Sequence, residues 1–245
     1  MAPDAFERLR SHLHPVALKR RAILQEHNRP IQHAYFIERG VASVFARTRR
    51  DGPVEVAIVG RMGFVGVAAV LGTMRSPNRC LMEVPGEALS IATPDLQRAM
   101  ADTPAVRQHL LNYVHALLIQ HTQTALCNVR HGLEERLCRW LLLAADRLDE
   151  TSIPLTHDQL AMILGVRRAG VTITLSELEK LGAVTKARGA VEIADRAVLE
   201  ERTCECYRII ASAYRRLVHS ESHDHLLHGA RSVATGPDRE SATEA

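Results

Sequence analysis

The sequence predicts an α+β fold in which an antiparallel β domain is followed by helices. Residues 22–91 alternate short apolar runs with turn signals, and after Pro104 no glycine or proline occurs until Gly132. From Thr156 onward, a helix start, a glycine turn and a second helix precede a hairpin pattern. These three observations divide the chain into four expected segments: residues 1–103, 104–131, 132–203 and 204–245.

The composition is that of a globular protein with room for two domains. Of its 245 residues, 46% are hydrophobic and 24% charged, while an aromatic content of only 4% argues against a base-stacking surface for single-stranded nucleic acid. No signal sequence and no stretch of about 18 apolar residues occurs, so we expect a cytoplasmic protein without a membrane partner. Five cysteines, an odd number, are expected as free thiols: Cys80, Cys127, Cys138, Cys204 and Cys206.

The first segment has the pattern of an antiparallel β sandwich or barrel. In runs such as VASVFART and VEVAIVG, β-branched and aromatic residues alternate with polar ones, and glycine or proline recurs about every ten residues. RRDGPVEV is typical of a hairpin turn. TPDLQRAMADTP then predicts a short helix with Thr93 as its N-cap and Pro94 at its first position.

The stretch from Ala105 to Gly132 predicts one long helix with two packed faces. Its only Lys, Arg, Asp or Glu residues are Arg107 and Arg130, and its apolar residues recur at intervals of three and four. Such a helix cannot be solvated all round, so we expect its own domain on one side and a two-fold-related copy on the other. A helix wholly buried in its own monomer is the alternative. The residues assigned to the homodimer contact are Leu110, Tyr113, Val114, Leu117, His121 and Thr124.

Two further helices are predicted before the glycine turn. LEERLCRWLLLAADRL, residues 133–148, is amphipathic. Thr156 and Gln159 have the spacing of a capping box, so a helix is expected to begin at Thr156 and to end after two turns at Gly165.

The helix after this turn has the pattern of a recognition helix for the major groove of DNA. Val171, Leu175 and Leu178 form a stripe toward the core, and the opposite face begins with an arginine suited to guanine O6 and N7. Small residues, including Gly170, would let the backbone approach DNA. AVTKARGAVEIA then predicts a hairpin that holds phosphate. The expected DNA contacts are Arg167, Arg168, Ala169, Thr172, Ile173 and Ser176 on the helix, Thr156 before it, and Lys186 and Arg188 on the hairpin.

The predicted DNA-binding segment is not basic overall. From Gly132 to Thr203 it holds ten Lys and Arg against twelve Asp and Glu residues. DNA binding must therefore depend on local placement of cations, and we expect modest affinity for nonspecific DNA.

The order of these parts resembles the Crp/Fnr family of bacterial transcription regulators. The resemblance covers about residues 15–205 and rests on AYFIERGVASVF, GRMGFVGV, the long helix, LEERLCRWLLLAADR and LTHDQLAMILGVRRAGVTITLSELEKLGAVTKARGAVEI. It implies a jelly-roll-like β-roll sensor domain, a dimerisation helix, a winged helix-turn-helix that binds a double-stranded operator, and RNA polymerase as a partner. Arg168 matches the family's base-contacting arginine. Ala169 and Ile173 replace a glutamate and a second arginine, so the operator sequence is expected to differ.

The resemblance also indicates where an effector would bind, and that it is not cyclic AMP. Family members that bind cyclic nucleotide carry a ribose-binding glutamate where this chain has Val67, and an Arg-Ser/Thr-Ala segment where it has Asn78, Arg79 and Cys80. With Gly63 and Gly66, these residues form the expected effector pocket. No cysteine precedes Cys80, which argues against the family's iron–sulfur cluster, and the thirteen histidines single out no heme ligand. The effector is therefore unknown.

No cofactor, metal site or enzyme activity is predicted. Nucleotide-binding glycine loops, metalloprotease motifs and nucleophile settings are absent from the sequence. Cys204 and Cys206 are interpreted as structural thiols, because residues two apart on a helix point to different faces. His115, His121 and His131 are interpreted as hydrogen-bonded interface histidines.

Two alternatives stay open. One is a cyclic-nucleotide-binding module without operator binding, and the other is a redox or metal sensor that uses Cys80, Cys127 or a histidine-rich tail. That tail carries His219, His223, His225 and His228 in a segment expected to be solvated and partly disordered. The operator sequence, and whether the protein activates or represses, do not follow from the sequence.

Overall fold

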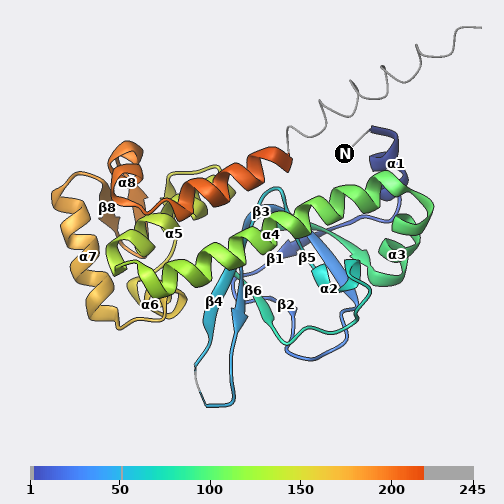
Figure 1. Cartoon of the computed structure of the whole chain (residues 1–245), viewed down its shortest axis with the longest axis horizontal. Coiled ribbons are helices and arrows are strands. Elements are labelled where there is room, and N and C mark those ends of the chain that lie inside the picture. Colours follow the sequence, from blue (N-terminus) through green and yellow to red (C-terminus); the bar gives the residue numbers. More distant parts are fainter. Residues whose placement is uncertain (1–2, 51, 218–245) are drawn as a thin grey trace, which may run out of the picture.

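The computed structural model describes residues 3–50 and 52–217, without the side chains of residues 3–6, and has the predicted α+β fold. Figure 1 shows a β domain at one end, a helical domain at the other, and one long helix running along both. The histidine-rich tail of the sequence lies outside the described residues. In the described part of the chain, no helix is both long and apolar enough to cross a membrane.

The β domain contains six antiparallel strands. Their order is β1-β6-β3-β4, with β2 paired to β6 and β5 paired to β3. The strands are β1 (His14–Leu18), β2 (Ile23–Gln25), β3 (His33–Ala46), β4 (Val54–Val59), β5 (Gly63–Val65) and β6 (Arg79–Ala92). The two longest, β3 and β6, pair along almost their whole length.

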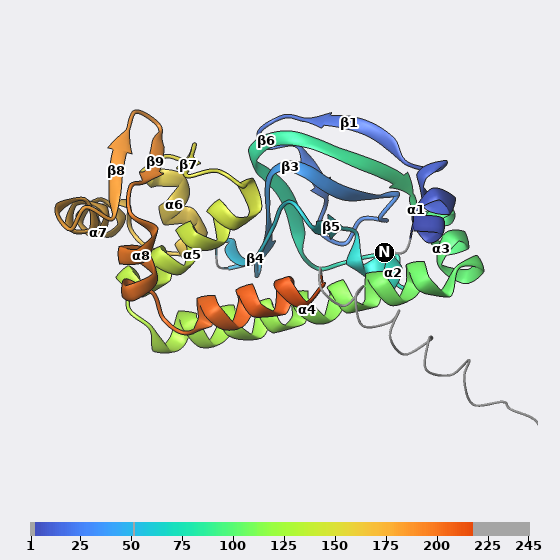
Figure 2. The same cartoon turned by 90° about the horizontal axis from the view of Figure 1, so that it is seen from above.

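Two glycines allow β3 and β6 to bend together. Gly40 has a φ of +86°, and a Cβ added to Gly86 would lie 2.0 Å from the backbone oxygen of Arg39. The register between the strands shifts at three places between Ile37 and Ala42. Bulges of this kind increase strand bending, and the sheet accordingly curls into a roll (Figure 2).

The helices beside the sheet are α1 (Pro3–Arg10), α2 (Val67–Val70), α3 (Thr93–Asp102) and α4 (Pro104–Arg130). The prediction that Thr93 caps α3 is wrong, because the N-cap is Ala92. The Thr93 hydroxyl instead donates a hydrogen bond to the Ile31 carbonyl at 2.8 Å and is buried. Its polar group therefore ties the helix to the β domain.

The helical domain contains α5 (Leu133–Leu148), α6 (His157–Leu164), α7 (Arg168–Lys180) and α8 (Arg196–Arg202). A small sheet of order β7-β9-β8 joins β7 (Ser152–Ile153), β8 (Val184–Ala187) and β9 (Ala190–Ile193). A last helix, described over residues 206–217, runs beside α4 in both views (Figures 1 and 2). The ring centroids of Tyr113 on α4 and Tyr214 on this helix are 6.1 Å apart.

A buried polar network joins the two domains. Trp140 Nε1 of α5 donates to Glu55 Oε1 of β4 at 2.7 Å, and the Ser43 hydroxyl donates to the other Glu55 oxygen. Arg147 of α5 donates to the Ile58 carbonyl at 3.1 Å and to Gln120 Oε1 of α4 at 2.7 Å. Burial raises the pKa of Glu55 to about 7. The helical domain is thus held against the β domain by directed bonds as well as by apolar packing.

Candidate functional site

The first helix of the helix-turn-helix begins and ends where its local sequence dictates. The Thr156 hydroxyl accepts from the Gln159 backbone N–H at 3.3 Å, and Gln159 Oε1 accepts from the Thr156 N–H at 3.0 Å. Gly165 then takes the left-handed conformation, with a φ of +65°, and ends α6. These two signals fix the angle at which α7 leaves the turn.

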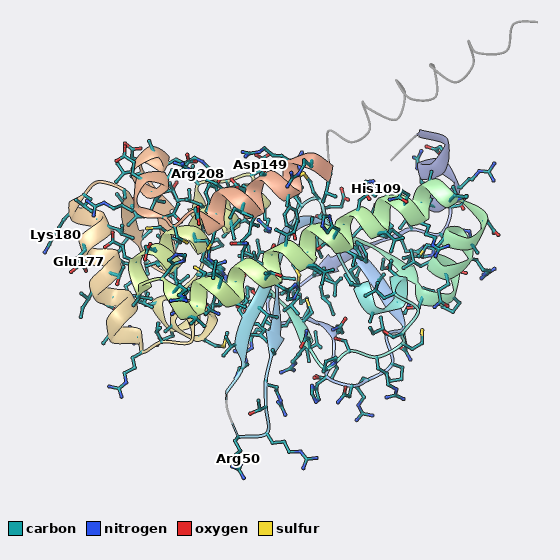
Figure 3. All side chains as sticks on the ribbon, in the orientation of Figure 1. Arg50, His109, Asp149, Glu177, Lys180 and Arg208 are labelled. Atoms are coloured by element: carbon teal, nitrogen blue, oxygen red, sulfur yellow. The ribbon has the colours of Figure 1, made fainter. Side chains whose placement is uncertain are left out.

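The second helix, α7, has one buried and one exposed face. Val171, Leu175 and Leu178 are fully buried. The opposite face carries the residues expected to contact DNA, and its Ile173 is 59% exposed although it is a large apolar residue. Figure 3 shows side chains of α7 projecting outward from the molecule, including those of Glu177 and Lys180 further along the helix.

Two residues in the first turn of α6 hold side chains of α7. Arg168 Nη1 lies 3.5 Å from Asp158 Oδ2, and both side chains are 66% exposed. His157 Nδ1 lies 3.0 Å from the Thr172 hydroxyl. Neither Asp158 nor His157 was among the residues predicted for the site. Their position directly behind the helix cap Thr156 was the available signal.

Gly170 has a packing role that the sequence did not predict. A Cβ added there would lie 3.0 Å from Leu133 Cδ2 of α5. Gly170 is half-exposed, and its lack of a side chain allows α7 to pack closely on α5.

The two hairpin cations differ in their surroundings. Lys186 Nζ lies 2.6 Å from Glu179 Oε2 and donates to the Ser176 hydroxyl at 3.1 Å. These bonds from Lys186 hold the pKa of Glu179 below its ordinary value. Arg188 is exposed beside Gly189, and within the described residues it makes no hydrogen bond or ion pair. Arg188 is therefore the hairpin cation that can reach another molecule without first breaking a contact.

The expected effector pocket is only partly assembled. A cavity of about 250 Å³ lies between the β domain and α4, and it is lined by Gly66, Val67, Asn78 and Cys80 from the predicted set. Gly63 lies outside it, because the space at its Cα is filled by Tyr113 and Val59. Arg79 is also outside, on a second cavity of about 350 Å³ that faces α6. The structure therefore brings Gly66, Val67, Asn78 and Cys80 to the wall of this cavity but not Gly63 or Arg79.

The wall of the first cavity combines apolar and polar groups. Leu117 and His121 of α4 line it, and His121 Nδ1 lies 2.7 Å from the Leu117 carbonyl. Arg75 also lines it and donates to the Asn28 carbonyl at 2.6 Å. Burial raises the pKa of the Cys80 thiol, which keeps it neutral. The volume of about 250 Å³ is slightly below the range of small-molecule sites, which begins at about 300 Å³.

The residues predicted for the dimer contact lie on the wrong face of α4. His121 is half-buried, and the other five are buried within their own chain: Leu110, Tyr113, Val114, Leu117 and Thr124. They pack against the β domain and the last helix. The prediction failed because α4 has two neighbours within the chain, and the sequence pattern does not show which apolar residues face them.

A different stripe on α4 faces solvent. Its most exposed large residues are Val129, at 82%, and Leu118, at 59%. The stripe consists of exposed or partly exposed residues spaced alternately by four and three: Leu111, His115, Leu118, Thr122, Ala125 and Val129. This spacing is that of a coiled-coil seam.

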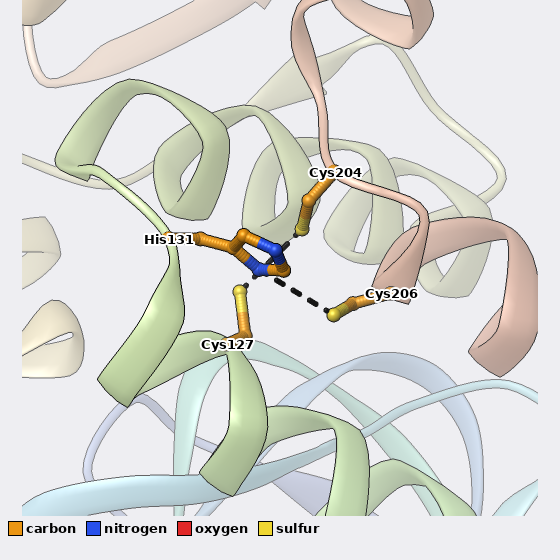
Figure 4. Close-up of side chains that lie close together, drawn as sticks. All are labelled: Cys127, His131, Cys204 and Cys206. Carbon is orange, nitrogen blue, oxygen red and sulfur yellow. Dashed lines mark hydrogen bonds between the residues drawn. The ribbon is translucent and has the colours of Figure 1, made fainter.

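The structure differs from the helical geometry expected for the cysteine pair. Cys204 lies before the last helix, which begins at residue 206, so the two side chains are not on opposite helix faces. Figure 4 shows both directed toward Cys127 and His131. Within residues 3–50 and 52–217, these four residues are the one group of three or more His, Cys, Asp or Glu side chains that lie close enough to bind a single metal ion.

The chain thus combines a β-roll, which has a cavity against a long helix, with a helix-turn-helix whose exposed second helix is followed by a β-hairpin. Residues 135–202 match the family of Crp-like helix-turn-helix domains. This match supports the resemblance to the Crp/Fnr family over the helical domain.

Solved structures extend this likeness to the whole fold. A putative Crp/Fnr regulator from Eubacterium rectale is 15% identical, with a TM-score of 0.63 over 82% of this chain and 94% of that one. FixK2 from Bradyrhizobium japonicum is 14% identical, with a TM-score of 0.68 over 78% and 98%. The c-di-GMP-responsive regulator CLP of Xanthomonas campestris is 18% identical, with a TM-score of 0.62 over 79% and 100%. No curated protein matches the sequence.

Proposed function

We propose that the protein is a homodimeric transcription regulator that binds a two-fold-related DNA operator with α7 in the major groove. The observation that carries the proposal is the exposed face of α7, where Arg168, Ala169, Thr172 and Ile173 lie on a capped helix-turn-helix. A partly exposed cation, small side chains and an exposed isoleucine are suited to base edges and thymine methyl groups. Arg167, Thr156 and Arg188 surround this face and supply contacts to phosphate.

The operator should carry a guanine that Arg168 contacts. The exposed ion pair with Asp158 is weak in water, so the guanidinium can leave it for a bidentate contact with guanine. Because Ala169 and Ile173 add no charge, the neighbouring base pairs are distinguished by apolar contact and shape.

The dimer forms through the exposed stripe of α4. Two copies related by a two-fold axis place the same stripe on both sides of one seam, which buries Leu118 and Val129. The two copies of α7 are then related by the same axis, as a palindromic operator requires.

An effector binds in the cavity between the β-roll and α4. Leu117 and His121 bring α4 into direct contact with an occupant of this cavity. An effector that binds one arrangement of α4 more tightly increases the fraction of molecules in that arrangement. It thereby changes the fraction of molecules whose two α7 helices are placed to bind DNA. With Val67 in place of an acidic residue, the cavity is not expected to hold cyclic AMP. RNA polymerase is the proposed further partner, by resemblance to the family.

The test is operator affinity after substitution of Arg168. Genome-wide mapping of bound DNA supplies the operator, and fluorescence anisotropy measures the Kd. Arg168→Ala is expected to cost about 1–3 kcal/mol on the specific site and to relax preference at one base pair. Lys180→Ala removes a charge from the last turn of the same helix and serves as the matched control. Unchanged binding by Arg168→Ala would refute the assigned face.

A further inference from the structure

Four potential metal ligands meet at the junction of α4 and the helical domain (Figure 4). Their ligand atoms all lie within 4.8 Å of one another. Cys127 Sγ is 3.5 Å from Cys204 Sγ, and Cys206 Sγ is 3.6 Å from His131 Nδ1. The helix-turn-helix does not use any of these side chains.

Local structure aims each pair of ligands at the same point. Cys127 and His131 are four residues apart at the end of α4, and the His131 N–H still bonds to the Cys127 carbonyl at 3.1 Å. Cys204 and Cys206 lie on either side of the turn into the last helix, where the Tyr207 N–H bonds to the Cys204 carbonyl at 3.2 Å. Residues two apart across a turn can converge, whereas within one helix they would diverge.

The spacing fits a single tetrahedral ion. With a Zn–S bond of about 2.3 Å, tetrahedral geometry sets neighbouring sulfurs roughly 3.8 Å apart. The Cys127–Cys204 sulfur separation of 3.5 Å is close to that value, and the shorter Zn–N bond suits the 3.6 Å between Cys206 Sγ and His131 Nδ1, so little movement is needed. A disulfide between Cys127 and Cys204 would use two of the four groups and would leave the approach of Cys206 to His131 without a role. A polynuclear iron–sulfur cluster would need a wider cage.

The surroundings are suited to the charge of a bound ion. Cys127 and Cys206 are fully buried, and Cys204 nearly so. Arg139 is also buried, close enough for its charge to act on Cys127 and Cys206, and its Nε has no hydrogen-bond partner in the described part of the chain. Three thiolates and a neutral imidazole around a divalent cation carry one net negative charge, which this guanidinium offsets. Such outer groups orient and tune metal sites.

We propose that Cys127, His131, Cys204 and Cys206 bind one Zn²⁺ ion, with Arg139 as the neighbouring countercharge. Thiolate and imidazole ligands in a closed four-coordinate set are those of structural zinc sites. Binding releases the thiol protons to solvent, and no oxidant or reductant takes part. The site goes beyond operator binding, because it holds the end of α4 and the start of the last helix together whether or not DNA is present.

The test uses the full-length chain, purified under reducing conditions without chelator. Elemental analysis is expected to find one zinc per chain. Cys127→Ser and Cys206→Ser are expected to lose most of it, whereas Cys80→Ser and Cys138→Ser, which change buried cysteines outside the group, are expected to keep it. Loss in the control variants equal to that in the ligand variants would overturn the proposal.

Cobalt substitution tests the ligand set in the unsubstituted chain, where misfolding of a variant plays no part. After zinc removal, Co²⁺ is expected to give the intense visible bands of a tetrahedral site and a sulfur-to-cobalt band in the near ultraviolet. Absence of these bands, with no Zn²⁺ retained at micromolar concentration, would overturn the proposal. So would a reduced chain that binds neither ion and forms a Cys127–Cys204 disulfide on exposure to air.

Discussion

Lys186 and Arg188 are two residues apart on one hairpin, yet their contacts give them different capacities. Lys186 would have to leave Glu179 and Ser176 to bind phosphate, whereas Arg188 has no such contact to break. Sequence reasoning placed both on the hairpin because the period-two pattern and the Arg-Gly turn are local signals. It did not predict the partner of Lys186, because Glu179 is seven residues away on another element.

Arg188→Ala is expected to weaken binding to all DNA sequences about equally, and by a larger factor than Lys186→Ala. Loss of a phosphate contact lowers affinity without changing base preference. Anisotropy titrations with the operator and with a scrambled duplex measure both effects. If Lys186→Ala caused the larger loss, Lys186 rather than Arg188 would be the principal phosphate contact.

The long helix α4 shows how far a sequence pattern specifies an element. The absence of glycine and proline and the three-four spacing correctly predicted one helix, described as Pro104–Arg130. The same pattern could not assign faces, since α4 is apolar nearly all round. The β domain and the last helix cover the faces of α4 that carry Leu110 and Tyr113. The stripe that contains Leu118 and Val129 is exposed to solvent.

Leu118→Glu is expected to convert the proposed dimer to a monomer at micromolar concentration. Two symmetry-related carboxylates would meet in the apolar seam, where an unpaired charge is costly. Sedimentation equilibrium measures the mass. Leu181→Glu, which also replaces an exposed leucine, is the control outside α4 and should remain dimeric. A dimeric Leu118→Glu protein would show that the copies meet elsewhere.

The cysteine group could not be predicted from its spacing alone. Cys127 and Cys204 are 77 residues apart in sequence, and only the return of the chain after α8 brings them together. In a continuous helix Cys204 and Cys206 would point to different faces, whereas the turn before residue 206 lets both side chains converge.

At the level of the complete protein, the stability contributed by Glu55 in the buried network between the domains should depend on pH. Burial raises the pKa of Glu55 from 4.5 to about 7. Between these values the folded state binds a proton that the unfolded state does not, so the free energy of unfolding falls as pH rises from about 4.5 to about 7. Below about pH 4.5, protonated Glu55 makes its full contribution to the free energy of unfolding. Above about pH 7 this contribution is lost.

Glu55→Gln is expected to flatten this dependence. The amide oxygen still accepts from Trp140 but cannot ionise. The difference in free energy of unfolding between pH 5 and pH 8 should shrink by up to about 3 kcal/mol, as measured by urea denaturation. Glu150→Gln, at an exposed position, provides the control. An unchanged difference in the Glu55→Gln protein would mean that Glu55 does not set the pH dependence.

The charge of the DNA-binding segment predicts a shallow salt dependence of operator affinity. Its ten basic residues are outnumbered by twelve acidic ones. With two or three phosphate-contacting cations in each copy, log Kd should change with log salt with a slope of about 4 to 5. Titrations in increasing KCl measure it, and a slope near 10 would contradict the small number of contacts.

The contact between Cys127 and Cys204 also brings the entry and the exit of the helical domain to one place. The chain enters the helical domain at the end of α4 and leaves it beside the same point. The domain is therefore connected to the rest of the chain by two adjacent segments. A single flexible connection would let the domain tumble in all directions. Two adjacent chain connections remove part of that freedom, and the buried bonds of Trp140 to Glu55 and of Arg147 to Ile58 remove more. Any signal that reaches α7 through this joint should therefore change the orientation of the helix much more than its distance from α4.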